Sequence, residues 1–409
     1  MAGTGVSGSS SSYNAAAAPK ILLAKPTLAN AGKFMRGGGS EEESSSSSSA
    51  SLRSRLHSVG SLNLLSDSWD FQIDRFLPFL TDNTDFTVVG VIGAAGVGKS
   101  TIMNELYGFD GTSPGMLPPF QLQTDEIRAI AKHCSTGIEP RVSAERIILL
   151  DTQPVFSPSL LSEIIRPDGS STISVLSGEV LSAELAHELM NIQLGVLLAS
   201  ICHIVLVVSD SVHDLNMWHL MLTVDLLKHG IPDPSSPTLT HSNLGAEKEN
   251  KDKLHDAGEE YIASPIFVHT RLHGEDLTLH NIRKMKKALA KCFSSSSFNI
   301  DKNQMTSRSS QSPSTCPNAQ SKNEDIPKLF LIPLKNKDDS TIALHDSFVL
   351  ILQKLRDQVL SSMDSSLFGR TVSERDWLRN SAKIWELVKN SPIIAEYARG
   401  LQNSGMFKR

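Results

Sequence analysis

Apolar and polar residues are arranged along the chain in blocks that predict short strands separated by helices. The apolar runs with the length and β-branched content of buried strands cover 86–92, 146–150, 202–208, 265–269 and 329–334. The stretches in which apolar residues recur at helical spacing are 99–107, 174–199, 215–228 and 281–293. Strands that alternate with helices favour a mostly parallel α/β sheet flanked by helices.

The C-terminal part, residues 342–401, predicts two further helices, at 342–363 and 374–401. The second has a capping-box start, with Ser373 followed three residues later by Asp376. The apolar side chains that we expect this helix to pack inward are Trp377, Leu378, Ile384, Trp385, Leu387 and Val388. These helices extend the predicted domain beyond its last strand.

Polar, low-complexity segments define the expected domain boundaries. Residues 1–65 are rich in Ser, Gly and Ala and include the run SEEESSSSSS, which offers too little apolar surface to offset the entropy of ordering. We therefore expect a disordered arm at 1–65 and one domain at 66–403, with low-complexity insertions at 232–260 and 294–325. The domain should begin with a short helix at 66–80, where apolar residues have mixed helical spacing.

The run GAAGVGKST lies between the first predicted strand and the first predicted helix. It satisfies the P-loop pattern GxxxxGK[ST], in which backbone amides and the positive end of the following helix face phosphate oxygens. We expect Lys99 to reach the β- and γ-phosphates and Ser100 to ligate Mg²⁺. The residues expected to hold the nucleotide are Gly93, Ala95, Gly96, Val97, Gly98, Lys99, Ser100 and Thr101. The alternative is a Gly-rich turn that happens to precede Lys-Ser. The sequence thus favours a P-loop, G-domain-like fold.

Asp151 ends the second predicted strand, where P-loop NTPases hold Mg²⁺ through water, although Asp is also common in turns. A Ras-like GTPase would continue as DxxG, but this chain reads Asp-Thr-Gln-Pro, and Pro154 has no amide proton to offer a γ-phosphate. Gln153 lies two places too early for the residue that positions the attacking water. Thr136 could close over Mg²⁺ as a switch threonine does, or it could be a turn residue.

The motif that reads guanine, NKxD, should follow the strand at 265–269, because its carboxylate accepts protons from guanine. The chain reads His-Thr-Arg-Leu over 269–272 instead, and no SAK motif follows the strand at 329–334. The expected ligand is therefore a nucleoside triphosphate or diphosphate, ATP or GTP with the base left open. Its hydrolysis is not expected.

Four stretches together resemble the SMG-nine family, whose members are subunits of the kinase complex of nonsense-mediated mRNA decay. They are RIILLDTQPVFSPSLL, CHIVLVV after a helix containing Asn191 to Gln193, AAGVGKST, and SERDWLRNSAKIWELVKNSPIIAEYARGL. The similarity runs from about Trp69 to Leu401. It implies a G-like domain that pairs with the related SMG-eight subunit, docks on the SMG-one kinase and controls phosphorylation of the UPF-one helicase. It also implies that the nucleotide is a structural ligand rather than a substrate.

The composition limits which partners the protein can be expected to bind and in which cellular compartment it is expected. The net charge is −5 over 409 residues and no local basic patch is evident, so we expect no sequence-specific binding to nucleic acid. No apolar run reaches the roughly 18 residues of a membrane span. The four cysteines have no paired spacing, which favours a reducing compartment. The expected location is the cytoplasm, with the nucleus as an addition.

Two functions from different classes fit these observations. The first is a regulatory scaffold subunit of an mRNA-surveillance kinase, a pseudo-GTPase that binds nucleotide without turning it over. The second is an active P-loop NTPase, which the intact Lys99, Ser100 and Asp151 permit. The missing GTPase motifs and the family resemblance favour the first, and weak NTPase activity stays open.

Overall fold

A computed structural model describes residues 62–109, 117–130, 132–176, 179–210, 212–240, 261–298, 328–334, 348–361 and 368–405. Most of the predicted arm and the greater parts of both predicted insertions lie outside these residues. Among the described helices, none combines the length and the apolar character that crossing a membrane requires.

A six-stranded sheet in the order β2-β3-β1-β4-β5-β6 forms the centre of the domain. Its strands are β1 (Thr87–Gly93), β2 (Ile138–Val142), β3 (Ile147–Thr152), β4 (Ile204–Asp210), β5 (Ser264–Leu272) and β6 (Lys328–Pro333). All neighbouring strands are parallel except β2, which is antiparallel to β3. The mostly parallel sheet confirms the predicted fold class.

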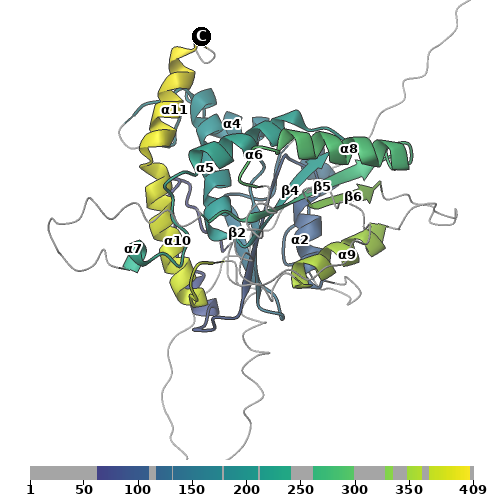
Figure 1. The fold of residues 1–409 in the computed structure, drawn as a ribbon. Coiled ribbons are helices and arrows are strands. Elements are labelled where there is room, and N and C mark those ends of the chain that lie inside the picture. Colours follow the sequence, from purple (N-terminus) through teal and green to yellow (C-terminus); the bar gives the residue numbers. More distant parts are fainter. Residues whose placement is uncertain are drawn as a thin grey trace, which may run out of the picture. The chain divides into compact units, whose positions relative to one another are not determined.

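Helices cover both faces of this sheet (Figure 1). One face carries α2 (Lys99–Tyr107) and α9 (Phe348–Ser361), and the other carries α5 (Ala183–Ile201), α6 (Leu215–Leu227) and α8 (Leu279–Cys292). Shorter helices are α3 (Asp125–Ala129), α4 (Pro158–Ile164) and α7 (Pro237–Thr240). Because both faces are covered, every residue of β1 and β3 is buried.

The chain leaves β1 through α2 to reach β3 on one side, and it returns through α5 to β4 on the other side. The connecting helices α2 and α5 lie on opposite faces (Figure 1). In open α/β sheets, such a change of direction leaves a crevice at the carboxyl ends of the strands, and ligands bind there. The topology therefore places the candidate site at the end of β1.

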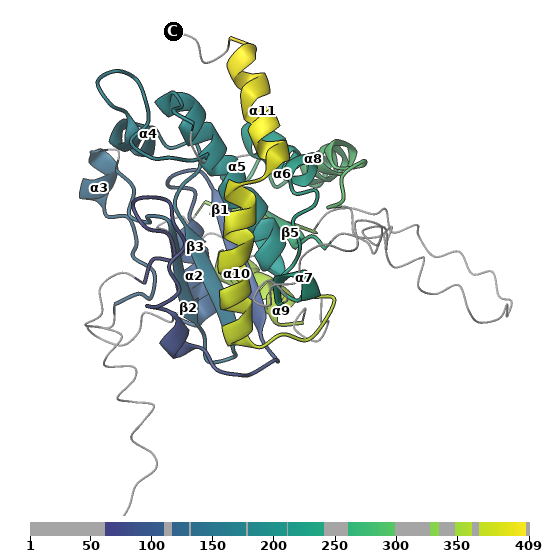
Figure 2. The ribbon, with the colours of Figure 1, turned by 90° about the vertical axis from the view of Figure 1, so that its left-hand side faces the viewer.

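The predicted helix at 374–401 is two helices, α10 (Glu374–Lys389) and α11 (Pro392–Asn403). Ser391 caps α11 by accepting a hydrogen bond from Ile394 N, and Pro392 takes the first helical position, so one helix ends and another begins. Figure 2 shows α10 alongside α5, as a layer outside the sheet and its covering helices. Of the predicted inward side chains, Leu387 is the exception, since it is exposed while the others are buried.

Helix α5 differs from its prediction both in where it begins and in how much of its surface is buried. The helix begins at Ala183 rather than near 174, because Ser182 caps it by accepting a hydrogen bond from Leu185 N. It is buried on nearly all sides rather than amphipathic, since it lies between β1 on one side and α6 and α10 on the other. The sequence of α5 carries a sign of this layering, because a helix that is apolar on nearly all sides is expected to be buried on nearly all sides.

The N-terminal edge of the domain also differs from its prediction. Residues 66–80 are irregular apart from the 3₁₀ turn η1 (Leu77–Phe79). The domain begins before 66, because Leu62, Leu64 and Leu65 are buried and Leu64 N donates to Ile138 O of β2 over 2.8 Å. The folded segment thus includes residues just before the predicted boundary at 65, and these residues lie against the edge strand β2.

One buried titratable group makes folding depend on pH. His203 Nδ1 accepts a hydrogen bond from Val88 N over 2.9 Å, and burial lowers the pKa of this imidazole to about 4. Between about pH 4 and 6.5 the unfolded chain binds a proton that the folded chain does not, so stability falls as pH falls through this window. This one group should cost about 2 kcal/mol of unfolding free energy by about pH 5, relative to about pH 7.

Urea unfolding at the two pH values will measure this loss. The variant His203→Asn, whose amide oxygen can accept the same bond, should lose less stability on acidification than the unchanged protein. The exposed His273→Asn serves as the matched control and should retain the full pH dependence. An identical pH dependence in His203→Asn would show that another group is responsible.

Candidate functional site

The loop between β1 and α2 has the geometry of a phosphate cradle. A side chain at Gly93 would place its Cβ 2.2 Å from Val208 O, and Gly96 and Gly98 have φ angles of 73° and 98°, in the left-handed region. Gly98 is also the N-cap residue of α2. The strand, loop and helix therefore follow one another as the GxxxxGK[ST] pattern predicts.

Lys99 folds back over this loop. Its ammonium donates to Ala94 O over 3.0 Å, and the side chain is buried. Burial lowers the pKa of this ammonium to about 8, although the nearby Asp151 carboxylate partly opposes the shift. A cation with few partners of its own at a helix N-terminus is suited to pair with an incoming anion.

Ser100 and Asp151 lie together, as the sequence predicts. The Ser100 hydroxyl donates to Asp151 Oδ2 over 2.7 Å, and the Ser135 hydroxyl donates to the same oxygen over 2.9 Å. Burial raises the pKa of the Asp151 carboxyl, and Lys99 with the two hydroxyls partly opposes this. The other oxygen, Asp151 Oδ1, is buried without a hydrogen-bond partner.

This arrangement fits a hydrated magnesium ion. A hydroxyl and a carboxylate with a free oxygen are hard ligands that Mg²⁺ accepts together with water and phosphate. Within the described part of the chain, no group of three or more His, Cys, Asp or Glu residues could hold a metal ion. A magnesium site would therefore depend on Ser100, Asp151, water and the bound phosphates.

Ser135 takes the place that sequence analysis considered for Thr136. Thr136 is exposed, whereas the Ser135 hydroxyl lies beside Ser100 and Asp151. The two neighbouring hydroxyl residues precede β2, and the sequence does not show which of them turns inward. β2 itself was missed, because Pro140 in its middle argues against a central strand and fits only an edge position.

Gln153 links the segment after β3 to the segment before β2, and its side chain is engaged there rather than at the phosphate cradle. Its side-chain Oε1 accepts from Gly137 N over 3.0 Å, and its own N donates to Gly137 O over 2.8 Å. The side chain is buried between β3 and the start of β2. Pro154, which has no amide proton, follows it and lines the cavity at the loop.

Two residues near the C-terminal end of β5, the buried Thr270 and the exposed Arg271, tie that strand to the loop. Thr270 Oγ1 donates to Val97 O over 2.9 Å, and the Arg271 guanidinium donates to Gly96 O and pairs with Asp210 at 2.9 Å. In the sequence, this stretch is notable only for lacking the guanine motif, and the role of Thr270 and Arg271 was not predicted. Both residues directly follow the strand predicted at 265–269, and this position at a strand end is the signal that could have indicated the role.

A cavity of about 210 Å³ opens over the loop. Most small-molecule sites measure about 300–1,000 Å³, so this cavity suits a phosphate chain and the base would lie outside it. The side chains before β2 that line it, which the sequence did not indicate, belong to Gln121, Leu122, Gln123, Arg128, His133, Cys134 and Ser135. Burial lowers the pKa of His133, whose Nδ1 lies 2.7 Å from Ser159 Oγ, so this ring favours the neutral form.

Comparison with known proteins finds relatives that match most of the chain. The nonsense-mediated mRNA decay factors SMG9 of Xenopus tropicalis and Xenopus laevis are each 30% identical over 82% of this chain and 66% of their own length. The SMG9 factor of Salmo salar is 28% identical over 83% of this chain and 67% of its own length. The chain thus spans about two thirds of these relatives.

Comparisons with protein-family models and with solved structures do not identify a further family. No protein-family model matches the chain. A septin GTPase domain from Chlamydomonas reinhardtii matches with a TM-score of 0.31 and 11% identity, over 74% of this chain and 98% of that one. The fold class is established by the sheet order and the P-loop described above.

The similarity to the SMG9 factors covers 82–83% of the chain, and therefore most of the described domain. By this similarity, the chain belongs to the SMG9 family of nonsense-mediated mRNA decay factors.

Proposed function

We propose that this chain is a nucleotide-binding regulatory subunit that holds its nucleotide without hydrolysing it. The observation that carries the proposal is an assembled phosphate cradle beside a glutamine that is already engaged. Lys99, Ser100 and Asp151 lie together at the loop after β1, which supports binding of phosphate and Mg²⁺ there. Gln153, in contrast, is hydrogen-bonded to Gly137 through both its backbone and its side chain. Such a domain can bind nucleotide and stay folded around it.

Binding would use the groups that the loop collects. Amides of the loop and the N-terminus of α2 would face the phosphates of a nucleoside triphosphate or diphosphate, ATP or GTP. Lys99 would add its positive charge, and Ser100 with Asp151 would hold a hydrated Mg²⁺, which screens the phosphate charge. Thr270 and Arg271 would keep the loop in shape from β5.

Hydrolysis would need a group that orients water against the terminal phosphate. At the end of β3 the chain offers Gln153, held in the sheet edge, and Pro154, which has no N–H. These two features support a pseudo-GTPase rather than an active P-loop NTPase.

Family membership supports a wider proposal. A domain that holds nucleotide as a structural ligand would serve as a scaffold in the kinase complex of nonsense-mediated mRNA decay. The proposed partners are an SMG-eight-like subunit and the SMG-one kinase, with phosphorylation of the UPF-one helicase as the regulated step. The proposed location is the cytoplasm, with the nucleus as an addition.

Purification of the tagged chain from its own cells tests these proposals together. Partners would be identified by mass spectrometry, and the bound nucleotide by chromatography after denaturation. Recovery of an SMG-eight-like subunit and a giant kinase, with intact nucleotide in the protein, is the expected result. Recovery of neither partner, together with measurable hydrolysis by the purified chain, would support an independent NTPase instead.

Nucleotide binding should weaken at alkaline pH. Because the pKa of the Lys99 ammonium is about 8 before binding, the charge that pairs with phosphate is fully present below this pH and is lost as pH rises through it. Above about pH 8, affinity should fall by up to about tenfold per pH unit, with uptake of one proton on binding. Calorimetry at about pH 7, 8 and 9 will measure both quantities, and equal affinity at all three would contradict a titrating Lys99 in the site.

A further inference from the structure

The outer side of α8 carries a concentration of positive charge that the proposed function does not use. Met285 and Leu289 are buried on the inner side of this helix. The exposed cations are Arg283, Lys284, Lys286, Lys287 and Lys291. The helix, Leu279–Cys292, contains no acidic residue. Its two sides therefore differ sharply in character, apolar toward the sheet and cationic toward solvent.

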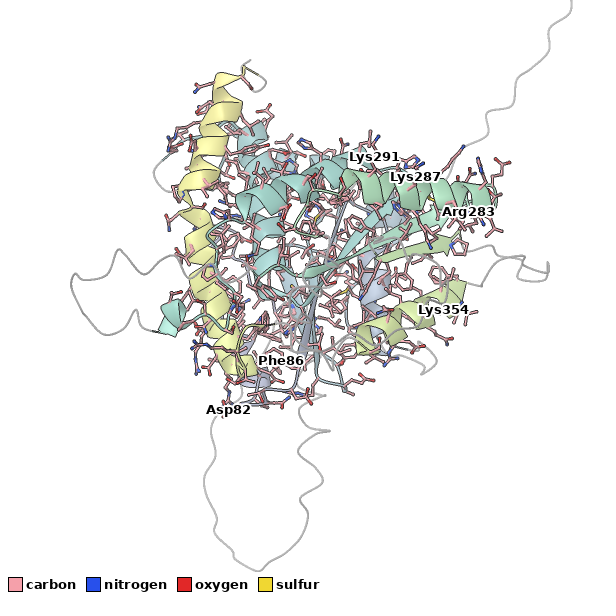
Figure 3. All side chains as sticks on the ribbon, in the orientation of Figure 1. Asp82, Phe86, Arg283, Lys287, Lys291 and Lys354 are labelled. Carbon is pink, nitrogen blue, oxygen red and sulfur yellow. The ribbon has the colours of Figure 1, made fainter. Side chains whose placement is uncertain are left out.

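Three of these cations form a straight row. Arg283, Lys287 and Lys291 are spaced four residues apart, so they lie on one side of the helix over roughly 12 Å. Figure 3 shows them one after another along α8. We call this row the basic stripe. The expectation that the chain has no local basic patch is therefore wrong: the helix predicted at 281–293 already contained these cations within 283–291, and its spacing of four residues places them on one side.

The basic stripe has no partner within the described part of the chain. No carboxylate there forms an ion pair with Arg283, Lys287 or Lys291. On α10, in contrast, Arg379 pairs with Asp376 and Lys389 pairs with Asp70. Like charges four residues apart destabilise a helix, so the stripe does not serve the stability of α8.

We propose that the basic stripe is a docking site for an acidic segment of a partner protein, one that presents a row of carboxylates along one side. We choose an acidic partner because its carboxylates would complement the positive charges of the basic stripe. The chain as a whole has a net charge of −5, which does not attract a long polyanion, whereas the stripe attracts one locally over a single helix.

Nucleic acid fits this surface less well. Proteins that bind single strands combine positive charge with aromatic side chains on which bases stack. Leu279–Cys292 contains no Phe, Tyr or Trp, and its cations are four lysines and one arginine. The lysine ammonium is a point charge on a flexible stem, which suits dispersed carboxylates, while arginine is preferred for bidentate phosphate contacts.

The test uses the full chain and a fluorescein-labelled peptide of about 12 glutamates, which is long enough to span the stripe. Fluorescence anisotropy would measure its affinity at about 50 and 200 mM NaCl. We expect binding that weakens with salt and falls about tenfold in the double variant Arg283→Glu/Lys287→Glu. This variant places Glu four residues before Lys291, a favourable pair, so α8 should remain folded.

The matched control is Arg166→Glu/Arg399→Glu, which changes the net charge equally at exposed positions on other elements. It should bind the peptide as the unchanged protein does. Equal losses in both double variants, or no binding of the peptide at the lower salt, would overturn the proposal. So would an oligouridylate of similar length that binds as tightly as the peptide and loses its binding in the α8 variant, since the occupant would then be nucleic acid.

Discussion

Replacing Trp385 by alanine will lower the free energy of unfolding by about 3–5 kcal/mol. Its side chain is fully buried, its indole N–H donates to Trp69 O over 3.0 Å, and its ring lies 5.4 Å from that of Trp69, edge to face. Trp69 in turn donates to Gln193 of α5 over 2.9 Å. The substitution leaves a cavity where α10, α5 and the N-terminal segment meet, and urea unfolding will measure its cost.

Two further variants separate packing from hydrogen bonding. Trp385→Phe keeps most of the buried area but leaves Trp69 O without its donor, so its cost should be about 1–3 kcal/mol. Leu387→Ala is the matched control on the same helix, because this side chain is 43% exposed, and it should change stability by no more than about 0.5 kcal/mol. A loss in Trp385→Ala as small as this control would show that α10 is not part of the folded core.

Lys99→Ala will weaken nucleotide binding by roughly 10- to 100-fold. A hydrogen bond to a charged group contributes about 1.5–3 kcal/mol, and Lys99 is the buried cation at the start of α2. Titration of a fluorescent nucleotide analogue will measure the loss. Thermal unfolding without nucleotide should show that the variant is folded, since desolvation of this ammonium already opposes its charge in the folded state.

Lys132→Ala is the control for charge, because Lys132 is an exposed residue in the segment that precedes β2. It should leave the affinity for nucleotide unchanged. Equal affinity in the unchanged protein and in Lys99→Ala, with both folded, would mean that nucleotide does not bind at this loop.

The parallel sheet and the P-loop could be predicted because they depend on local pattern. Buried strands such as β1 and β3 are continuous apolar runs, and the strand, glycine loop and helix around Lys99 are contiguous in the sequence. The elements that were missed or misplaced depend on contacts between distant segments. β2 contains Pro140 and exists as an edge strand beside β3.

Among the helices too, local pattern predicts that an element exists, whereas contacts with distant segments decide where it begins and ends. Periodicity could not show where α5 begins, because the apolar residues before Ala183 also pack inward without forming a helix. Nor does periodicity separate α10 from α11, because apolar residues keep their helical spacing across the break, although Pro392 is a local stop signal. Local pattern gives the type of an element more reliably than its ends.

In the candidate site as well, some residues could be predicted from local sequence and others could not. Lys99, Ser100 and Asp151 were predicted together because motif and strand end place them at one edge of the sheet. Ser135 and Thr270 reach that edge from other elements, and only the fold brings them there. Hydroxyl residues are too common in sequences for position alone to mark these two.

The central claim is that the loop holds nucleotide without turnover, and release of phosphate by the purified chain tests it most directly. The chain would be loaded with ATP or GTP and Mg²⁺, and bound nucleotide and free phosphate would be followed together, with Lys99→Ala as the reference. We predict one nucleotide bound per chain and no phosphate release above that reference. Phosphate release that exceeds the reference and rises with the amount of protein would contradict the claim and establish an active NTPase.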